Sequence, residues 1–226
     1  MSRRRRPVPS FDLGVTTHES VYRGLRNRIL FGGFLPGSAV TLRGLAEDMG
    51  VSPMPIREAV RRLIAERALD MQDNRRVLVP PMTRSKFEQI VFARKVLEPE
   101  LAVRALDRIG RAEIKQIMVH DAAVDRAMAV GDVHGYMQSN YLFHFAIYEH
   151  AQAETLLALV ESIWLQFGPF MRMAYGRFGT STLEDQHQVA IAALSTRHRK
   201  ALKAAITADI GQGMNFIGEA VLKDGG

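Results

Sequence analysis

Two short amphipathic patterns joined by a glycine, between residues 41 and 69, restrict the fold of this chain more than any other feature. Gly50 suits the left-handed backbone that ends a helix, and Ser52 followed by Pro53 suits the start of the next helix. The first pattern places apolar residues on one helical face: Leu42, Leu45, Ala46 and Met49. The second has an apolar stripe at the same spacing: Ile56, Ala59, Val60, Leu63 and Ile64. This arrangement predicts either a helix-turn-helix or an ordinary helical hairpin.

The face opposite the second stripe is basic and carries Arg57, Arg61 and Arg62. In a helix-turn-helix these side chains would belong to a recognition helix that enters the major groove of DNA. In a plain hairpin they would form a solvated basic surface, and the pattern alone does not separate the two interpretations.

The flanking segments favour the helix-turn-helix. Residues 18–32 precede it with apolar residues at helical spacing, and Met71 and residues 77–79 resemble two short strands around the polar turn 73–76. A basic hairpin directly after a recognition helix is a wing. The sequence therefore predicts a winged helix-turn-helix.

The net charge of +6 lies entirely with this part of the chain. Residues 1–82 contain 14 arginines, no lysine and 8 acidic residues, whereas the remainder contains 16 basic and 16 acidic residues. Such asymmetry is expected when only one part of a protein neutralises phosphates. Residues 1–16, with four arginines and two prolines, are expected to form a disordered arm. That arm either adds nonspecific affinity for DNA or is a solvated tail.

Composition excludes several classes of protein. The chain has no cysteine, which rules out a disulfide scaffold, thiol catalysis and cysteine-ligated zinc. No apolar run reaches the length of a membrane span, and no apolar segment of a secretory signal follows the basic N-terminus. We therefore expect a cytoplasmic protein without a membrane partner.

Pro80 and Pro81 mark a boundary, after which the sequence is helical to its end. Six amphipathic helices with short loops are expected, over residues 85–109, 111–130, 132–150, 154–178, 182–194 and 199–222. Short loops between such helices predict an antiparallel bundle. The predicted fold is thus mainly α, with a winged helix-turn-helix over residues 17–82 and a six-helix bundle over residues 83–226.

Residues 21–82 resemble the GntR family of bacterial transcription factors. The motifs that carry the resemblance occur in the family's order: LPG at 35–37, GVS at 50–52, REA at 57–59 and the NRRVLV wing at 74–79. The resemblance implies that Arg43 and Arg57 contact DNA and that Ser52 touches a phosphate. The chain departs from the family at Pro53, where a basic contact residue is usual, and at Met54, where a small polar residue is common. The candidate DNA-binding residues are Arg43, Ser52, Pro53, Met54, Arg57, Arg61, Asn74, Arg75 and Arg76.

Residues 83–222 resemble the ligand-binding domain of the FadR-like branch of this family, called the FCD domain. The resemblance lies in RKVLEP at 94–99, NYLFH at 140–144 and EDQH at 184–187. Relatives with a metal in this domain use an aspartate, a histidine four residues later and one histidine on each of two later helices. The corresponding set here is Asn140, His144, His187 and Asp209.

This set carries one carboxylate, as the family set does, but at the last position instead of the first. Two histidines, one aspartate and one asparagine could hold zinc, nickel or manganese and leave positions open for an effector. The alternative is that His144 and His187 line a pocket that binds an effector without metal. Three residues are candidates for contacting the effector itself: Arg94 by the resemblance, and Arg172 and Tyr175 by helical placement.

The sequence indicates a homodimeric regulator that binds double-stranded DNA at a palindromic operator. Repression is the expected mode of regulation, and activation is the alternative. Its effector is expected to be a small organic acid, because Arg94 could pair with a carboxylate. Two alternatives stay open: a metal-dependent enzyme built in the bundle, for which no supported general base is visible, and a nonspecific DNA-binding protein. The second would leave the neutral C-terminal part without a role. We expect no enzymatic activity.

Overall fold

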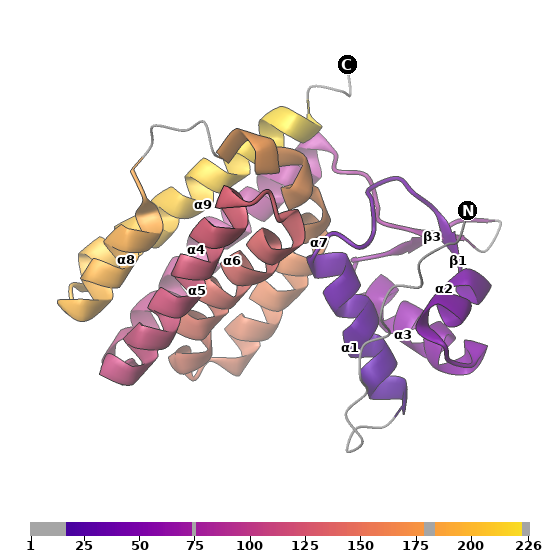
Figure 1. Cartoon of the computed structure of the whole chain (residues 1–226), viewed down its shortest axis with the longest axis horizontal. Helices are drawn as coiled ribbons and strands as arrows, with labels where there is room; N and C mark the ends of the chain where they lie inside the picture. Colours follow the sequence, from indigo (N-terminus) through magenta and orange to yellow (C-terminus); the bar gives the residue numbers. More distant parts are fainter. Residues whose placement is uncertain (1–16, 74–75, 179–183, 223–226) are drawn as a thin grey trace. The chain divides into compact units, whose positions relative to one another are not determined.

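The computed structural model describes residues 17–73, 76–178 and 184–222 (Figure 1). By its internal contacts the chain divides into two compact units. One comprises residues up to Ile29 and Gly33–Pro81, and the other comprises Leu30–Gly32 together with the chain from Met82 onward. Each unit is described by itself.

The N-terminal unit contains three helices, α1 (Thr17–Leu30), α2 (Leu42–Met49) and α3 (Pro53–Ala65). Three short strands follow the order β1-β3-β2 in an antiparallel sheet: β1 (Val40–Thr41), β2 (Asp70–Met71) and β3 (Arg76–Leu78). The helix-turn-helix and its wing are confirmed. The prediction missed β1, because a two-residue strand is too short to show the alternation that identifies strands.

Local backbone chemistry places the turn between α2 and α3. Gly50 has a φ of 65°, in the left-handed region, and caps the C-terminus of α2, as predicted. Its amide donates to the carbonyls of Ala46 and Glu47. Pro53 begins α3, where its missing amide hydrogen costs nothing. Ser52 occupies the N-cap position in extended backbone, but its hydroxyl makes no capping hydrogen bond. The predicted N-cap position is therefore confirmed, but the backbone conformation and Pro53 start the helix without help from the serine side chain.

Arg62 is exposed, as the sequence pattern predicts, but its guanidinium is engaged by residues of α1. Its guanidinium lies 3.6 Å from the centre of the Tyr22 ring and 2.9 Å from the Glu19 carboxylate. Tyr22 in turn donates a hydrogen bond of 2.7 Å to Glu66. Burial and the negative charge of Glu66 raise the pKa of Tyr22 to about 12. Arg62 thus joins α3 to α1 and is structural.

The C-terminal unit is a bundle of α-helices, as predicted. It contains α4 (Arg84–Ala105), α5 (Arg111–Ala129), α6 (Val133–Tyr148), α7 (Glu154–Phe178), α8 (Gln186–Ser195) and α9 (Arg199–Val221). Two 3₁₀ turns, η1 (Leu106–Arg108) and η2 (Glu149–Ala151), follow α4 and α6. Helix α9 packs against α4, α7 and α8, and α5 packs against α6 and α8. None of the described helices has the length and apolar character that a membrane crossing requires.

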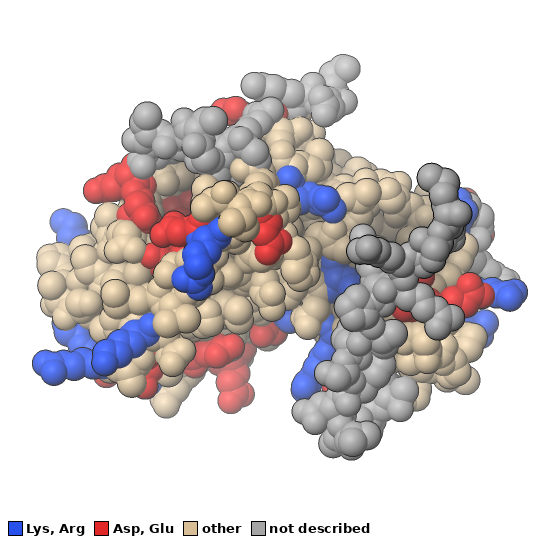
Figure 2. All heavy atoms as spheres, in the orientation of Figure 1, with Lys and Arg blue, Asp and Glu red and all other residues tan. Residues whose placement is uncertain are grey.

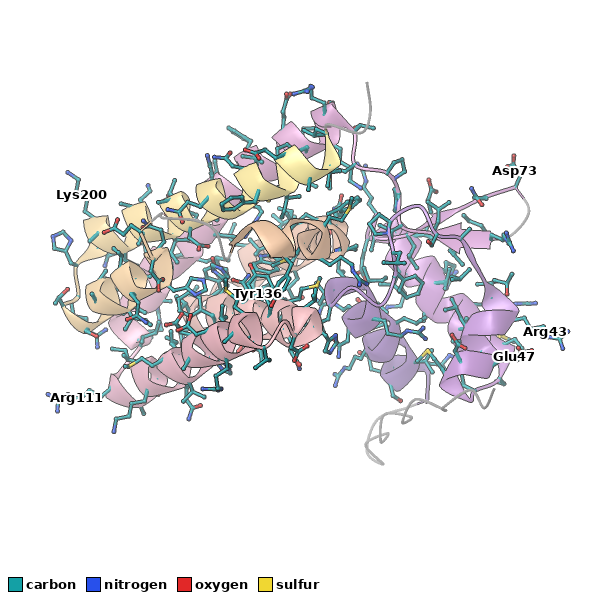
Figure 3. The ribbon with its side chains drawn as sticks, turned by 45° about the horizontal axis from the view of Figure 1, so that its top comes forward. Arg43, Glu47, Asp73, Arg111, Tyr136 and Lys200 are labelled. Atoms are coloured by element: carbon teal, nitrogen blue, oxygen red, sulfur yellow. The ribbon has the colours of Figure 1, made fainter. Side chains whose placement is uncertain are left out.

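The bundle surrounds an aromatic core. The largest side chains that are fully buried in it are Trp164, Tyr148, Phe143, Phe145, Phe167 and Phe170. In Figure 3 the side chain of Tyr136 lies among the helices, whereas Arg111 and Lys200 project away from them. These core residues come from α6 and α7, and α6 also carries polar residues of the cavity described below.

Asp132 sets the start of α6. Its carboxylate accepts a hydrogen bond of 2.9 Å from the amide of Gly135. We predict that Asp132→Ala lowers the free energy of unfolding by about 1 kcal/mol, because a helix amide loses its acceptor. Asp132→Asn keeps that oxygen and should change stability by only a few tenths of a kcal/mol, about the spread among good caps. Urea denaturation followed by circular dichroism measures both, and equal losses in the two variants would contradict the capping role.

Candidate functional site

The candidate DNA-contacting surface of the N-terminal unit consists of the exposed side of α3 and the turn before it. Met54 is 63% exposed, and Ser52, Pro53 and Arg57 are exposed beside it. The free hydroxyl of Ser52 at the N-terminus of α3 suits a phosphate, which helix amides attract. Arg57 has no ion-pair partner among the residues that the structure describes.

Two other candidate arginines are held by neighbouring carboxylates. Arg43 lies 2.9 Å from Glu47, one turn later on α2, and both side chains project outward in Figure 3. Arg61 lies 2.8 Å from Glu58. These pairs are solvent-exposed and therefore weak enough to be exchanged for a phosphate. Among the wing candidates, Arg76 is exposed on β3, while Asn74 and Arg75 lie outside the described residues.

A cavity of about 280 Å³ lies in the C-terminal bundle. Its lining comes from all six helices and from the residues that precede α8. Three of the four predicted metal ligands meet there: His144 from α6, His187 from α8 and Asp209 from α9. Each offers one ligand atom, and these atoms lie within 4.8 Å of one another. Asn140, the fourth, lines the same cavity one turn before His144.

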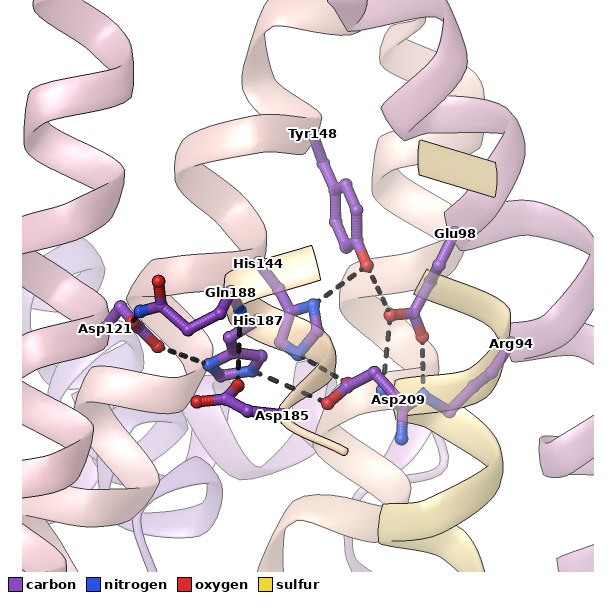
Figure 4. A network of polar contacts seen from close by, with 9 residues as sticks. All are labelled: Arg94, Glu98, Asp121, His144, Tyr148, Asp185, His187, Gln188 and Asp209. Carbon is purple, nitrogen blue, oxygen red and sulfur yellow. Dashed lines mark hydrogen bonds and ion pairs between the residues drawn. The ribbon is translucent and has the colours of Figure 1, made fainter. Parts of the chain in front are cut away.

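Both histidines turn the same nitrogen toward Asp209 (Figure 4). The Nε2 atom of His144 lies 3.2 Å from one carboxylate oxygen, and the Nε2 atom of His187 lies 3.6 Å from the other. His144 is 1% exposed and His187 is 8% exposed, so bulk water does not separate these groups. The two buried imidazoles and the partly exposed carboxylate thus form a compact cluster.

The other ring nitrogen of each histidine is held by a separate partner. The Nδ1 atom of His144 lies 3.1 Å from the hydroxyl of Tyr148, and that hydroxyl donates a hydrogen bond of 2.9 Å to Glu98. Because a phenol has a single hydrogen, Tyr148 can only accept from His144. The Nδ1 atom of His187 lies 2.9 Å from the carboxylate of Asp121 and must be the donor there as well.

These contacts determine whether the Nε2 atoms that face Asp209 carry a hydrogen or a lone pair. A neutral imidazole that carries its hydrogen on Nδ1 has a lone pair on Nε2. Two lone pairs would then face a carboxylate, which repels them unless positive charge lies between. That charge is supplied either by protonation of the imidazoles or by one bound cation. The arrangement of a carboxylate or hydroxyl behind each ligating histidine is the one found at protein metal sites.

The pKa values of this cluster follow from the same contacts. Burial on its own would raise the pKa of Asp209, but the hydrogen bond from His144 and the charges of both histidines lower it to about 2. Burial would lower the pKa of His187, but the bond to Asp121 and the charge of Asp209 raise it. The carboxylate is therefore ionised across the physiological range and available as a ligand.

Of the three residues predicted to contact the effector, Arg94 lines the cavity, whereas Arg172 and Tyr175 do not. Arg94 is buried, binds both oxygens of Glu98, and lies 4.1 Å from the centre of the Phe167 ring. The guanidinium of Arg172 donates to the carbonyl of Gly32, and the hydroxyl of Tyr175 donates to the carbonyl of Ala127. Neither residue lines the cavity, because each is turned to a backbone carbonyl.

Several polar residues of the site were not singled out from the sequence. Tyr148 and Glu98 each lie one helical turn after a candidate, His144 and Arg94, and that spacing could have identified them. Asp121 is 66 positions from His187, and nothing in a single sequence signals that pairing. Three more acidic residues line the cavity: Asp125, Glu184 and Asp185.

Comparison with known proteins agrees with both units. Residues 17–79 match the family model described as bacterial regulatory proteins, gntR family, and residues 89–212 match the FCD domain. The HTH-type transcriptional regulator McbR of Escherichia coli is 24% identical over 183 residues, which cover 80% of this chain and 83% of McbR. The gluconate operon transcriptional repressor of Bacillus licheniformis is 25% identical, with coverages of 77% and 74%.

Solved structures share the fold. The structure of E. coli McbR/YncC superimposes with a TM-score of 0.83 at 22% identity, covering 91% of this chain and 98% of that one. A GntR-type regulator from Rhodococcus sp. RHA1 gives a TM-score of 0.73 at 20% identity, with coverages of 91% and 99%. The winged helix-turn-helix, the helical bundle and the two family matches together show that this chain belongs to the gntR family and is a transcriptional regulator with an FCD domain, not an enzyme.

Proposed function

We propose that this regulator is a homodimeric repressor whose affinity for a palindromic operator is set by a small ligand in the cavity of the bundle. The observation that carries the proposal is the cluster of His144, His187 and Asp209, which lines a cavity in the same chain as a DNA-reading unit. The name of the B. licheniformis relative supports repression in particular. In such a regulator the ligand acts by binding one of two states more tightly than the other.

A divalent metal ion fits the cluster. His144 and His187 would bind it through Nε2 and Asp209 through its carboxylate, with the amide oxygen of Asn140 as a further donor. Nitrogen and oxygen ligands of this kind suit zinc, nickel or manganese. When bound, such an ion would supply positive charge between the lone pairs and the carboxylate, and its remaining coordination positions would be open.

The dimer is supported by an exposed apolar pair. Phe92 and Val96 lie one turn apart on α4 and are 71% and 52% exposed. Exposed apolar residues on one helical face are typical of surfaces that another protein covers. Two copies of the winged unit would read two half-sites, which gives the operator its two-fold symmetry.

Arg57 provides the test of DNA recognition, because it is exposed on α3 and its guanidinium is not engaged by a carboxylate within the described ranges. We expect Arg57→Ala to weaken operator binding about tenfold and to reduce the salt slope by about one. Fluorescence anisotropy with an operator selected from random DNA measures both quantities. Arg104→Ala is the control, since it removes an exposed arginine from α4. Equal effects of the two substitutions would contradict the proposed surface.

His144→Ala tests the metal site. We expect the wild-type protein to bind zinc, nickel or manganese and the variant to lose at least about 100-fold in affinity, because one of few ligands is gone. Metal analysis and calorimetric titration measure content and affinity. His150→Ala is the control, because His150 does not line the cavity. Full metal content in His144→Ala would rule out this site.

Tyr148→Phe tests the role of the hydroxyl behind His144. The substitution keeps the ring and removes the group that holds Nδ1, and it should weaken metal binding by about 10–100-fold. Tyr175→Phe removes a hydroxyl that donates to the backbone carbonyls of Ala127 and Met128 and to no histidine, and it should leave metal affinity unchanged. Unchanged metal affinity in Tyr148→Phe would show that the hydroxyl does not orient the ligand.

A further inference from the structure

The lining of the cavity is strongly acidic. Five carboxylates line it: Asp121, Asp125, Glu184, Asp185 and Asp209. Among the lining residues that the structure describes, Arg94 is the only lysine or arginine, and Glu98 neutralises it through two contacts. One divalent ion at the cluster would still leave three of the five negative charges without compensation. The electrostatic field in the cavity is therefore negative with or without a metal ion.

These carboxylates fall into two groups. Asp121 and Asp209 are engaged by the histidines, and Asp121 also accepts a hydrogen bond from the Gln188 amide. Asp125 from α5 and the adjacent Glu184 and Asp185 before α8 are exposed and lie toward solvent. The acidic entrance, as we call these last three residues, carries the charge that an incoming ligand meets first. Figure 2 shows acidic side chains gathered on the face of the bundle seen there.

No lysine or arginine within the described ranges forms an ion pair with the acidic entrance. Glu184 accepts a hydrogen bond from the neutral amide of Gln186, and Asp185 accepts one from the backbone amide of Gln188. Burial and the nearby charges of Asp121 and Asp185 raise the pKa of Asp125, as expected where like charges gather. The negative charge of the entrance is therefore available to a ligand.

The remaining wall is apolar and aromatic. It includes Tyr136, Phe167 and Phe216 together with Val124, Met128 and Met171. Aromatic faces attract cations, and Phe167 already does so in this cavity, since the guanidinium of Arg94 lies 4.1 Å from its centre. Carboxylates on one side and aromatic rings on the other are the combination that recognises ammonium and guanidinium groups.

We infer that the cavity selects a small organic cation, an amine or a guanidinium compound, and not the free carboxylic acid that the sequence indicated. The inference rests on the proposed function, which makes this cavity the effector site. An organic acid would approach the acidic entrance against three negative charges and would find the guanidinium of Arg94 already bound by Glu98. A cation would be attracted by the entrance and would pack its carbon chain against the aromatic wall.

The direct test compares two small molecules with the same number of carbon atoms and opposite charge. Putrescine and succinate each have four carbons, with an ammonium or a carboxylate at both ends. We expect calorimetry on the full-length protein, metal-free and zinc-loaded, to show putrescine binding at least about tenfold more tightly than succinate. Agmatine, which has a guanidinium in place of one ammonium group, should bind as well. Tighter binding of succinate, or binding of neither cation, would overturn the inference.

A pair of double variants assigns the effect to the acidic entrance. Asp125→Asn/Glu184→Gln removes two charges there and should weaken putrescine binding about tenfold while strengthening that of succinate. Glu88→Gln/Asp107→Asn removes two exposed charges that do not line the cavity and should change neither affinity. Equal changes in the two double variants would show that only the total charge of the protein matters and would overturn the assignment.

The same ligands separate this inference from the proposed function. Binding is measured without DNA, and operator affinity is measured afterwards with each ligand that binds. If a cation binds and operator affinity stays constant, the cavity recognises cations but is not the effector site. If succinate binds more tightly and releases the operator, the cavity is the effector site and the inferred cationic class of its ligand is wrong.

Discussion

The C-terminal unit depends on one electrostatic conflict, the carboxylate of Asp209 facing the Nε2 atoms of His144 and His187. Tyr148 and Asp121 hold the hydrogen of each neutral ring on Nδ1, so the Nε2 atom that faces Asp209 carries a lone pair unless the ring is protonated. Positive charge at this point, as protons or as a metal ion, removes the repulsion. Since the three residues come from α6, α8 and α9, whatever supplies that charge also connects three helices of the bundle. A cation that binds there would therefore also contribute to helix packing.

A single sequence predicts those features that local spacing encodes. Apolar periodicity identified every helix of the bundle, and the glycine and proline of the turn identified the helix-turn-helix. The resemblance to the FCD domain assigned His144, His187 and Asp209 to one site, and the three side chains do lie together in the bundle. What the sequence could not show depends on contacts between distant residues. Helical spacing singled out Arg172 as a residue of the cavity, but the same spacing also allows its side chain to turn to the carbonyl of Gly32, as it does here.

The contrast between the expected and the inferred ligand has a physical basis. A family resemblance predicts the position of a single residue, such as Arg94 on α4. The charge that a ligand would meet depends instead on all residues that line the cavity. Here Glu98, one turn after Arg94, occupies the guanidinium, and the acidic entrance adds negative charge from α5 and from the segment before α8. A family can therefore keep the framework of a site while the chemistry of its ligand changes.

The proposed metal site places a cation between the two imidazoles and Asp209. Its most direct test is a crystal structure of the protein grown with zinc, with anomalous scattering data collected at the zinc edge. We predict an anomalous peak within ligand distance of both Nε2 atoms and of the Asp209 carboxylate, with Tyr148 and Asp121 still behind the rings. A map without such a peak, with each Nε2 hydrogen-bonded directly to Asp209, would contradict this placement.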